Sequence, residues 1–140
     1  MNLGAARVFV REIAEAKAFY SERLGLTVEV ADEEHGFCMF DTGATKLIIE
    51  AVSSEDEEGR ELVGRFTGLS FPVEDIQSKH RQLSAAGVEF SGAPERQYWG
   101  GWLATFKDPS GNGLQLVQEP AQQIAARDVR RRTRVSNSVG

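Results

Sequence analysis

Apolar and polar residues alternate along two short runs near the end of the chain, residues 102–107 and 114–118. A period of two places successive side chains on opposite faces of a sheet, so each run is predicted to be a β-strand. Between the runs lies the sequence DPSG, in which proline presets φ and glycine accepts the positive φ of a tight turn. Pro120 ends the second run, because proline cannot donate to a strand ladder. The pattern predicts a strand, a turn and a strand.

Residues 1–52 predict a helix among strands. Ile13, Ala16 and Tyr20 recur at helical spacing, and Gly25 is placed to end that helix. Alternating or apolar runs bounded by polar turns predict the surrounding strands, at residues 7–10, 26–31, 37–41 and 46–52. The predicted order of elements is therefore βαβββ.

Residues 53–66 separate this unit from the next one. Five acidic residues fall within residues 55–61, so we interpret the segment as an exposed, largely irregular linker. After it, residues 69–73 predict a strand, and Asp75 is the expected N-cap of a helix over residues 76–86. The same order of elements has begun again.

The two units also resemble each other in sequence. Residues 10–13 (VREI) match residues 73–76 (VEDI) at an offset of 63. A half-sheet with one helix cannot bury both of its faces, but two such modules side by side can close a cup. We therefore predict an α+β fold, in which two βαβββ modules form a cup-shaped, mostly antiparallel sheet with the helices outside. Function is expected inside that cup.

The stretch formed by WGG, the DPSGN turn and LQLVQ resembles the last two strands of the glyoxalase / bleomycin-resistance / extradiol-dioxygenase superfamily, also called vicinal oxygen chelate proteins. Upstream, VFVREIAEAKAFYSERLGL resembles that family's first strand and helix. The resemblance covers residues 5–119 and implies a single glyoxalase-like domain over residues 1–119. The repeat places its modules at 1–52 and 67–119, and residues 120–140 follow as a basic tail. It does not select a reaction, because this fold serves isomerases, lyases, dioxygenases, epimerases and drug-sequestering proteins.

Members of this family that use a metal bind it with four inward-facing side chains, commonly His and Glu, from the first and fourth strands of both modules. The matching positions in this chain are Ala5, Ile48, Gly68 and Gln115. Only Gln115 has a donor atom, and one neutral amide does not hold a divalent cation. His35 falls in a polar turn, and His80 falls on the second helix facing the outside of the sheet. We therefore expect no metal site and no cofactor.

The alternation predicts eight side chains inside the cup: Arg7, Phe9, Ile48, Glu50, Ser70, Pro72, Gln115 and Val117. Among them, Arg7, Phe9, Ile48, Ser70 and Gln115 are candidate ligand-binding residues. Glu50 is the candidate catalytic residue, because a carboxylate in partly apolar surroundings could act as a general base or anchor a cationic ligand. The alternative is that Glu50 lies at a frayed strand end or pairs with Arg7.

Two tryptophans complete the candidate site. Trp99 and Trp102 flank a pair of glycines and offer aromatic faces that could stack on a flat or cationic ligand. The alternative is that both rings serve core and dimer packing.

The composition, 41% hydrophobic and 26% charged over 140 residues, is that of a soluble globular protein. The chain contains no apolar run long enough to span a bilayer and no leader-like start, so we expect a cytoplasmic location without membrane partners. The single cysteine, Cys38, lies in an alternating run and is interpreted as a structural thiol.

The net charge of −5 is unevenly distributed. Residues 121–140 contain five arginines and one aspartate, so residues 1–120 carry −9. An acidic body argues against nucleic acid as a partner, although the arginine run at 130–134 could touch an acidic partner or nucleic acid. We interpret this tail as mobile and solvated.

These observations favour a metal-free binding protein of the bleomycin-resistance type, which sequesters or carries a planar and in some cases cationic small molecule. The alternative is an enzyme of the same fold, either a lyase or isomerase resembling glyoxalase I or a dioxygenase. A homodimer is expected in both cases, because open module edges are templates for pairing.

Overall fold

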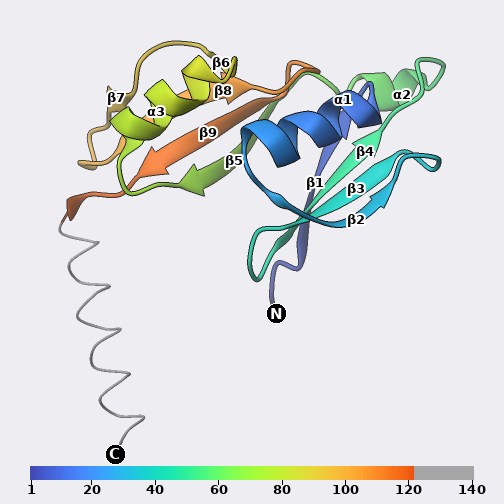
Figure 1. Ribbon diagram of the computed structural model, residues 1–140, viewed down its shortest axis with the longest axis horizontal. Helices are drawn as coiled ribbons and strands as arrows, with labels where there is room; N and C mark the ends of the chain where they lie inside the picture. Colours follow the sequence, from blue (N-terminus) through green and yellow to red (C-terminus); the bar gives the residue numbers. More distant parts are fainter. Residues whose placement is uncertain (122–140) are drawn as a thin grey trace, which may run out of the picture.

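The computed structural model describes residues 1–121. Figure 1 shows two modules side by side, each with one helix lying against one face of its own sheet. No helix in this part of the chain is long and apolar enough to cross a membrane. The predicted α+β fold with two modules of common element order is confirmed.

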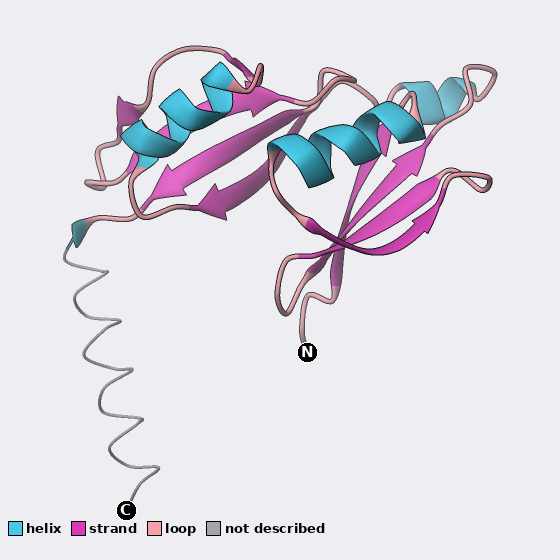
Figure 2. Cartoon of the chain, viewed as in Figure 1, coloured by secondary structure: helices cyan, strands magenta, loops and turns pink. Residues whose placement is uncertain are grey.

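The first module follows the predicted order βαβββ (Figure 2). Its four strands form one sheet in the order β1-β4-β3-β2, in which β1 and β4 are parallel and the other pairs are antiparallel. The strand bounds are β1 Ala5–Val10, β2 Thr27–Asp32, β3 Phe37–Asp41 and β4 Lys46–Ala51.

The helix predicted from residue 13 consists of two parts, α1 Ile13–Ala18 and the π-helix η1 Phe19–Arg23. In η1 the backbone N–H of Leu24 donates to the carbonyl of Phe19, five residues earlier. Both Phe19 and Tyr20 are buried there. The π-turn therefore contributes two neighbouring aromatic rings to the core.

The second module repeats this plan with one change. Its sheet runs β5-β9-β8-β6, with β7 also pairing with β8, and the β5–β9 pair is parallel like β1–β4. Two short strands thus replace the single second strand of the first module. The elements are β5 Phe66–Pro72, α3 Ile76–Ala85, β6 Glu89–Phe90, β7 Glu95–Arg96, β8 Trp102–Lys107 and β9 Gly113–Gln118.

The helix α3 begins where the sequence indicated. Asp75 is its N-cap, and the carboxylate accepts a hydrogen bond from the backbone N–H of Ser78 at 3.1 Å. The strand before it starts earlier than predicted, at Phe66, and has a register shift against β9 before Ser70. Gly68 lies within that irregularity with a φ of +76°, a conformation that glycine adopts without strain.

The acidic segment between the modules contains a short helix, α2 Glu57–Arg60, which we did not predict. Asp56 caps it by accepting a hydrogen bond from the backbone N–H of Gly59 at 2.9 Å. Val63, farther along, forms an isolated parallel bridge with Phe9 of β1. The chain between the modules is therefore held against β1 at Val63, shortly before it enters the second module.

A single hydrophobic core joins the two modules on the helix side of the sheets. The ring of Phe19, from η1, lies 6.5 Å from the ring of Phe106, from β8 of the other module. Tyr20 lies 5.9 Å from Phe40 on β3, measured between ring centroids. Cys38 is fully buried in the same core, and burial raises the pKa of its thiol, as expected for a structural cysteine.

Candidate ligand-binding site

Each sheet has one face against its helix and one face that the helix leaves open. In the first module, the register pairs Phe9 of β1 with Glu50 of β4, and Glu50 with Phe37 of β3. Asp32 of β2 pairs with Phe37 and completes the row. Paired residues point to the same face, so aromatic rings and carboxylates alternate across this row of the open face.

Glu50 is half-buried between the two phenylalanines, on the second-last residue of β4. Within residues 1–121, its carboxylate has neither a hydrogen-bond partner nor an ion pair, so the expected alternative of a pair with Arg7 is not observed. Arg7 lies one row away, paired in register with Ile48. A carboxylate in this position can accept hydrogen bonds from a donor that enters the open face.

The second sheet presents a more polar open face. Ser70 of β5 pairs with Gln115 of β9, and Gln115 pairs with Thr105 of β8. The Nε2 of Gln115 donates to the Oγ1 of Thr105 at 3.2 Å, across the two strands. Pro72 and Val117 form the next row, so the four residues of this module that were predicted to face the cup share one face.

Trp102 takes the second of the two roles that the sequence left open, packing in the core. It pairs in register with Gln118, whose side-chain oxygen accepts a hydrogen bond from the backbone N–H of Ile76 at the start of α3. That contact places the Gln118 side chain, and with it Trp102, on the helix face, where Trp102 packs against the core. In β8, residues 103 and 105 therefore lie on the open face.

Trp99 lies in the loop before β8 and is 38% exposed. Its ring lies against Gly101, where an added Cβ atom would come within 1.8 Å of the ring and 2.6 Å of the backbone oxygen of Gln118. The WGG motif is therefore a packing motif, in which the second glycine leaves space for the indole. The two tryptophans do not share a face with Glu50 in the described structure.

The donor set does not fit the divalent metal that the family resemblance implies. Of the four matching positions, Ala5, Ile48, Gly68 and Gln115, only the last carries a donor atom. The Nδ1 of His35 lies 2.8 Å from the Oδ2 of Asp32 in an exposed turn. The ring of His80 packs against the ring of Phe90 on the helix side, with 4.5 Å between the ring centroids. No group of three or more His, Cys, Asp or Glu side chains suited to a metal ion occurs in residues 1–121.

The DPSGN turn has a structural role that we did not predict from the sequence. Its polar side chains are buried, whereas those of a surface turn would be exposed. Asp108, Ser110 and Asn112 are each at most 5% exposed. The Oδ1 of Asp108 accepts from the backbone N–H groups of Ser110 and Asn112, both at 2.9 Å, which fixes the turn from within. Buried polar groups need partners, and this turn supplies its own.

The same turn also binds the first module. The Nδ2 of Asn112 donates to the backbone carbonyl of Phe9 at 2.8 Å, and the phenol of Tyr20 donates to Asp108 at 2.8 Å. Burial and, next, the Asp108 carboxylate raise the pKa of Tyr20 above its usual value, so the phenol stays protonated and remains a donor. Arg11 adds bonds from its backbone N–H and its guanidinium to Ser110. The turn therefore fixes the relative position of the two open faces.

The predicted site residues are distributed over several hollows. Arg7 and Phe9 line a small hollow of about 50 Å³ at the seam between β1 and β5. Ser70 lines a second hollow of about 230 Å³ between β4 and β5. Gln115 lines a third, of about 250 Å³, beneath the segment that joins β6 to β7. The last of these was not predicted, although the sequence SGAP at residues 91–94 is a signal for a broken strand.

Comparisons with known proteins agree with this architecture. Residues 2–116 match the model of the Glyoxalase/Bleomycin resistance protein/Dioxygenase superfamily. A protein named Bleomycin resistance protein from Klebsiella pneumoniae is 28% identical over 115 residues, which cover 77% of this chain and 85% of that protein.

Two solved structures are similar over nearly their whole length. A superfamily member from Sphaerobacter thermophilus DSM 20745 has a TM-score of 0.72 at 29% identity, covering 85% of this chain and 98% of that one. TnmS3, an antibiotic binding protein from Streptomyces sp. CB03234, has a TM-score of 0.68 at 26% identity, covering 85% and 96%. The chain belongs to the glyoxalase/bleomycin resistance protein/dioxygenase superfamily, as the resemblance of its sequence motifs indicated.

Proposed function

We propose that this protein binds a planar, cationic small molecule on the open face of its first sheet and thereby sequesters or carries it, without a metal. The observation that carries the proposal is the row Phe9–Glu50–Phe37, in which a half-buried carboxylate lies between two aromatic side chains. Aromatic faces supply stacking area for a flat ring system, and the carboxylate supplies the opposite charge. The similarity to a bleomycin resistance protein and to an antibiotic binding protein supports this choice.

The open face is also the reason to propose a homodimer. Phe9, Phe37 and Ile48 are only half-buried there, and Val30 on the outer strand is 39% exposed. A second copy of the chain would cover this apolar surface and enclose the ligand. Analytical ultracentrifugation should give twice the monomer mass of 15.4 kDa at micromolar concentration. A cytoplasmic location stays part of the proposal.

The direct test is isothermal titration calorimetry with proflavine, a planar cation, and with acridone, a neutral molecule of similar shape. Glu50→Gln should weaken proflavine binding by roughly tenfold, because a charge-assisted hydrogen bond contributes about 1.5 kcal/mol or more. The same variant should leave acridone binding unchanged. Phe37→Ala should weaken both compounds by about two- to tenfold, through loss of stacking.

Glu34→Gln is the matched control. It removes the same charge from an exposed turn residue of the same module and should change neither titration. Absence of binding by either compound, or equal effects of Glu50→Gln and Glu34→Gln on proflavine, would remove the basis of the proposal.

The position of Glu50 also supports a second candidate, a metal-free lyase or isomerase in which this carboxylate takes a proton from a bound substrate. The favouring observation is that its oxygens have no partner among residues 1–121 and face the open side of the sheet. Such an enzyme should lose turnover by about 100-fold or more in Glu50→Gln while keeping substrate affinity. A binding protein would show the reverse pattern, a change in affinity alone.

A further inference from the structure

The second strand of the second module is interrupted in a way that opens a pocket. β6 and β7 both pair with β8, and residues 91–94 lie between them. Opposite these four residues, β8 has only Ala104 and Thr105, because Phe106 pairs with β6 and Leu103 pairs with β7. The two extra residues must leave the plane of the sheet. Proline at position 94 cannot donate a ladder bond, so the strand stays open there.

The resulting pocket has a defined floor and wall. The Thr105 and Gln115 side chains form the floor on the open face, and Glu95 and Gln97 belong to the wall above it. Ser91 closes one end, where its backbone N–H donates to the carbonyl of Thr105 at 2.9 Å. At about 250 Å³ the pocket is smaller than the roughly 300–1,000 Å³ of sites for drug-sized ligands. It therefore fits a substituent better than a complete ligand.

The hydrogen-bond inventory of this pocket favours a ligand rich in donors. The amide nitrogens of Gln97 and Gln115 already donate, to the Glu95 carbonyl at 3.1 Å and to Thr105 at 3.2 Å. The Ser91 hydroxyl donates to the Thr105 carbonyl at 3.3 Å. In contrast, the Glu95 carboxylate and the side-chain oxygens of both glutamines accept no bond from residues 1–121. One N–H of each glutamine amide and the Ser91 hydroxyl are therefore used within the protein, while the Glu95 carboxylate and the two amide oxygens stay available to donors of a ligand.

The charge of the pocket also favours a ligand that donates hydrogen bonds, and in particular a cationic one. Glu95 is the only charged residue among those that line it in the described structure. Lys107 lies on the same face of β8, but it is paired in register with Glu89 on β6. An anionic group would meet the Glu95 carboxylate with no lining cation to offset it, whereas an ammonium group would gain a charge-assisted bond.

We propose that this pocket is a subsite for an amino sugar, that is, a saturated ring carrying one ammonium group and several hydroxyl groups. The inference rests on the proposed function in one respect, because the sugar would be a substituent of the small molecule that the protein binds. It narrows the ligand class to planar compounds that are glycosylated with an amino sugar. Ammonium and hydroxyl donors match the Glu95, Gln97 and Gln115 acceptors, and the ring matches the size of the pocket.

The test is an NMR titration of ¹⁵N-labelled full-length protein with glucosamine, with N-acetylglucosamine as the uncharged probe. At about 10 mM, sufficient for a Kd of about 1 mM, glucosamine should shift the backbone signals of Ser91 and Thr105 and the side-chain amide of Gln115. Glu95→Gln should weaken glucosamine by at least threefold, to the level of N-acetylglucosamine. Gln115→Ala should weaken both sugars. Glu89→Gln, a matched charge removal on β6, should change neither.

Shifts confined to the acidic residues 55–61, or no shifts at this concentration, would overturn the subsite. Equal affinity of the two sugars for the unmodified protein would overturn it as well. The proflavine titration separates this failure from that of the proposed function. If proflavine binds and glucosamine does not, the proposed planar site is retained and the subsite is refuted. If glucosamine binds and proflavine does not, the subsite is retained and the proposed planar site is refuted.

Discussion

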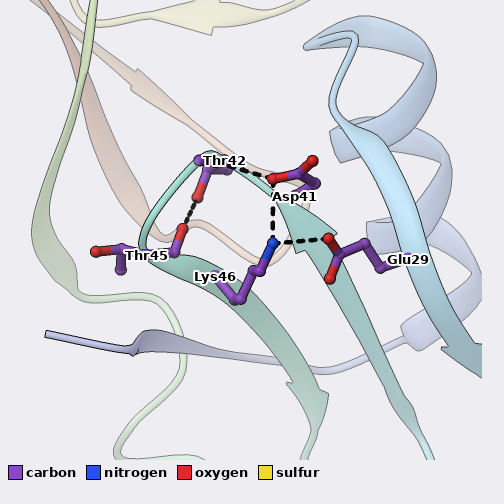
Figure 3. Close-up of polar contacts among 6 residues, drawn as sticks. Glu29, Asp41, Thr42, Thr45 and Lys46 are labelled. Carbon is purple, nitrogen blue, oxygen red and sulfur yellow. Dashed lines mark hydrogen bonds and ion pairs between the residues drawn. The ribbon is translucent and has the colours of Figure 1, made fainter.

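The two modules have the same order of elements, yet they use the turn between their last two strands differently. In the first module this turn is exposed, and Lys46 holds it with ion pairs to Glu29 at 2.7 Å and to Asp41 at 3.2 Å (Figure 3). Thr42 adds a bond to the backbone carbonyl of Thr45 in the same turn. In the second module the corresponding turn, residues 108–112, is buried and polar.

This difference shows that, in a fold built from two similar modules, the turn of one module can make most of the contacts that hold the modules together. The exposed turn bonds within its own module, to Glu29 on β2 and to the Leu3 carbonyl before β1, and exposed ion pairs contribute little to stability. The buried turn bonds to β1, to η1 and to the segment before β5, through Phe9, Tyr20 and Gly64. Mutations at equivalent places in the two modules should therefore have unequal effects.

The largest effect is expected for Asn112→Ala. It removes three hydrogen bonds, to the Phe9 carbonyl, the Asp108 carboxylate and the Gly64 N–H, all between 2.8 and 2.9 Å. At about 1 kcal/mol for each bond, the free energy of unfolding should fall by about 3 kcal/mol. Urea denaturation measures this free energy. Thr42→Ala in the exposed turn is the matched control, and its free energy of unfolding should stay within about 0.5 kcal/mol of that of the unmodified protein. Equal effects of the two substitutions would refute the difference between the turns.

The next largest effect is expected for Gly101→Ala, which should lower the free energy of unfolding by about 1–3 kcal/mol through overpacking. The new methyl group would meet both the Trp99 ring and the backbone oxygen of Gln118, and the backbone cannot move aside as a side chain can. Gly92→Ala is the control from the same module, because a Cβ atom there would have no neighbour within 4 Å. Thermal unfolding of both variants, followed by circular dichroism, should separate them clearly; similar midpoints would contradict the packing role of the WGG motif.

Tyr20→Phe isolates a single bond between the modules. The substitution removes the phenol that donates to Asp108, while Asn112 still donates to the same carboxylate oxygen at 2.9 Å. Since one partner remains, the expected loss is about 1–1.5 kcal/mol, less than for Asn112→Ala. The double variant in a denaturant cycle should show that the two losses are not additive, because both residues share Asp108.

The smallest effect is expected for Asp41→Asn in the exposed turn. The Gly43 backbone N–H and then Lys46 lower the pKa of Asp41. A lowered pKa stabilises the fold above the unfolded-state value of about 3.9, and the contribution disappears as the pH falls through the folded-state value. The small difference between Asp41→Asn and the unmodified protein should therefore be present at neutral pH and vanish once the pH falls below the lowered pKa of Asp41. A difference that grows on acidification would contradict this sign.

The sequence predicted the strands and the repeat well, because hydrophobic periodicity is a local signal. The alternation of inward and outward side chains in β4 and β9 follows from it, and with it the open-face positions of Glu50 and Gln115. The phase of β8 did not follow, so the sequence left open whether Trp102 stacks on a ligand or packs in the core. A strand that begins after a glycine-rich loop can start on either face, and only its partners decide which.

The buried turn and the pocket could not be predicted for a different reason. DPSGN has the composition of an exposed turn, and its burial depends on Tyr20 and Phe9, which are 88 and 103 residues away from their partners in the turn. The pocket depends on a mismatch of four residues against two between strands, which appears only once both pairings are known. Long-range pairing is the information that local patterns do not contain.

The most direct test of the central claim, that the open face of the first sheet binds the ligand, is chemical-shift mapping of proflavine on the ¹⁵N-labelled protein. We expect shifts centred on the backbone of β1, β3 and β4 around Phe9, Phe37 and Glu50, and their loss in Glu50→Gln. Shifts centred instead on α1 and α3, or on Trp102 at the helix face, would contradict it.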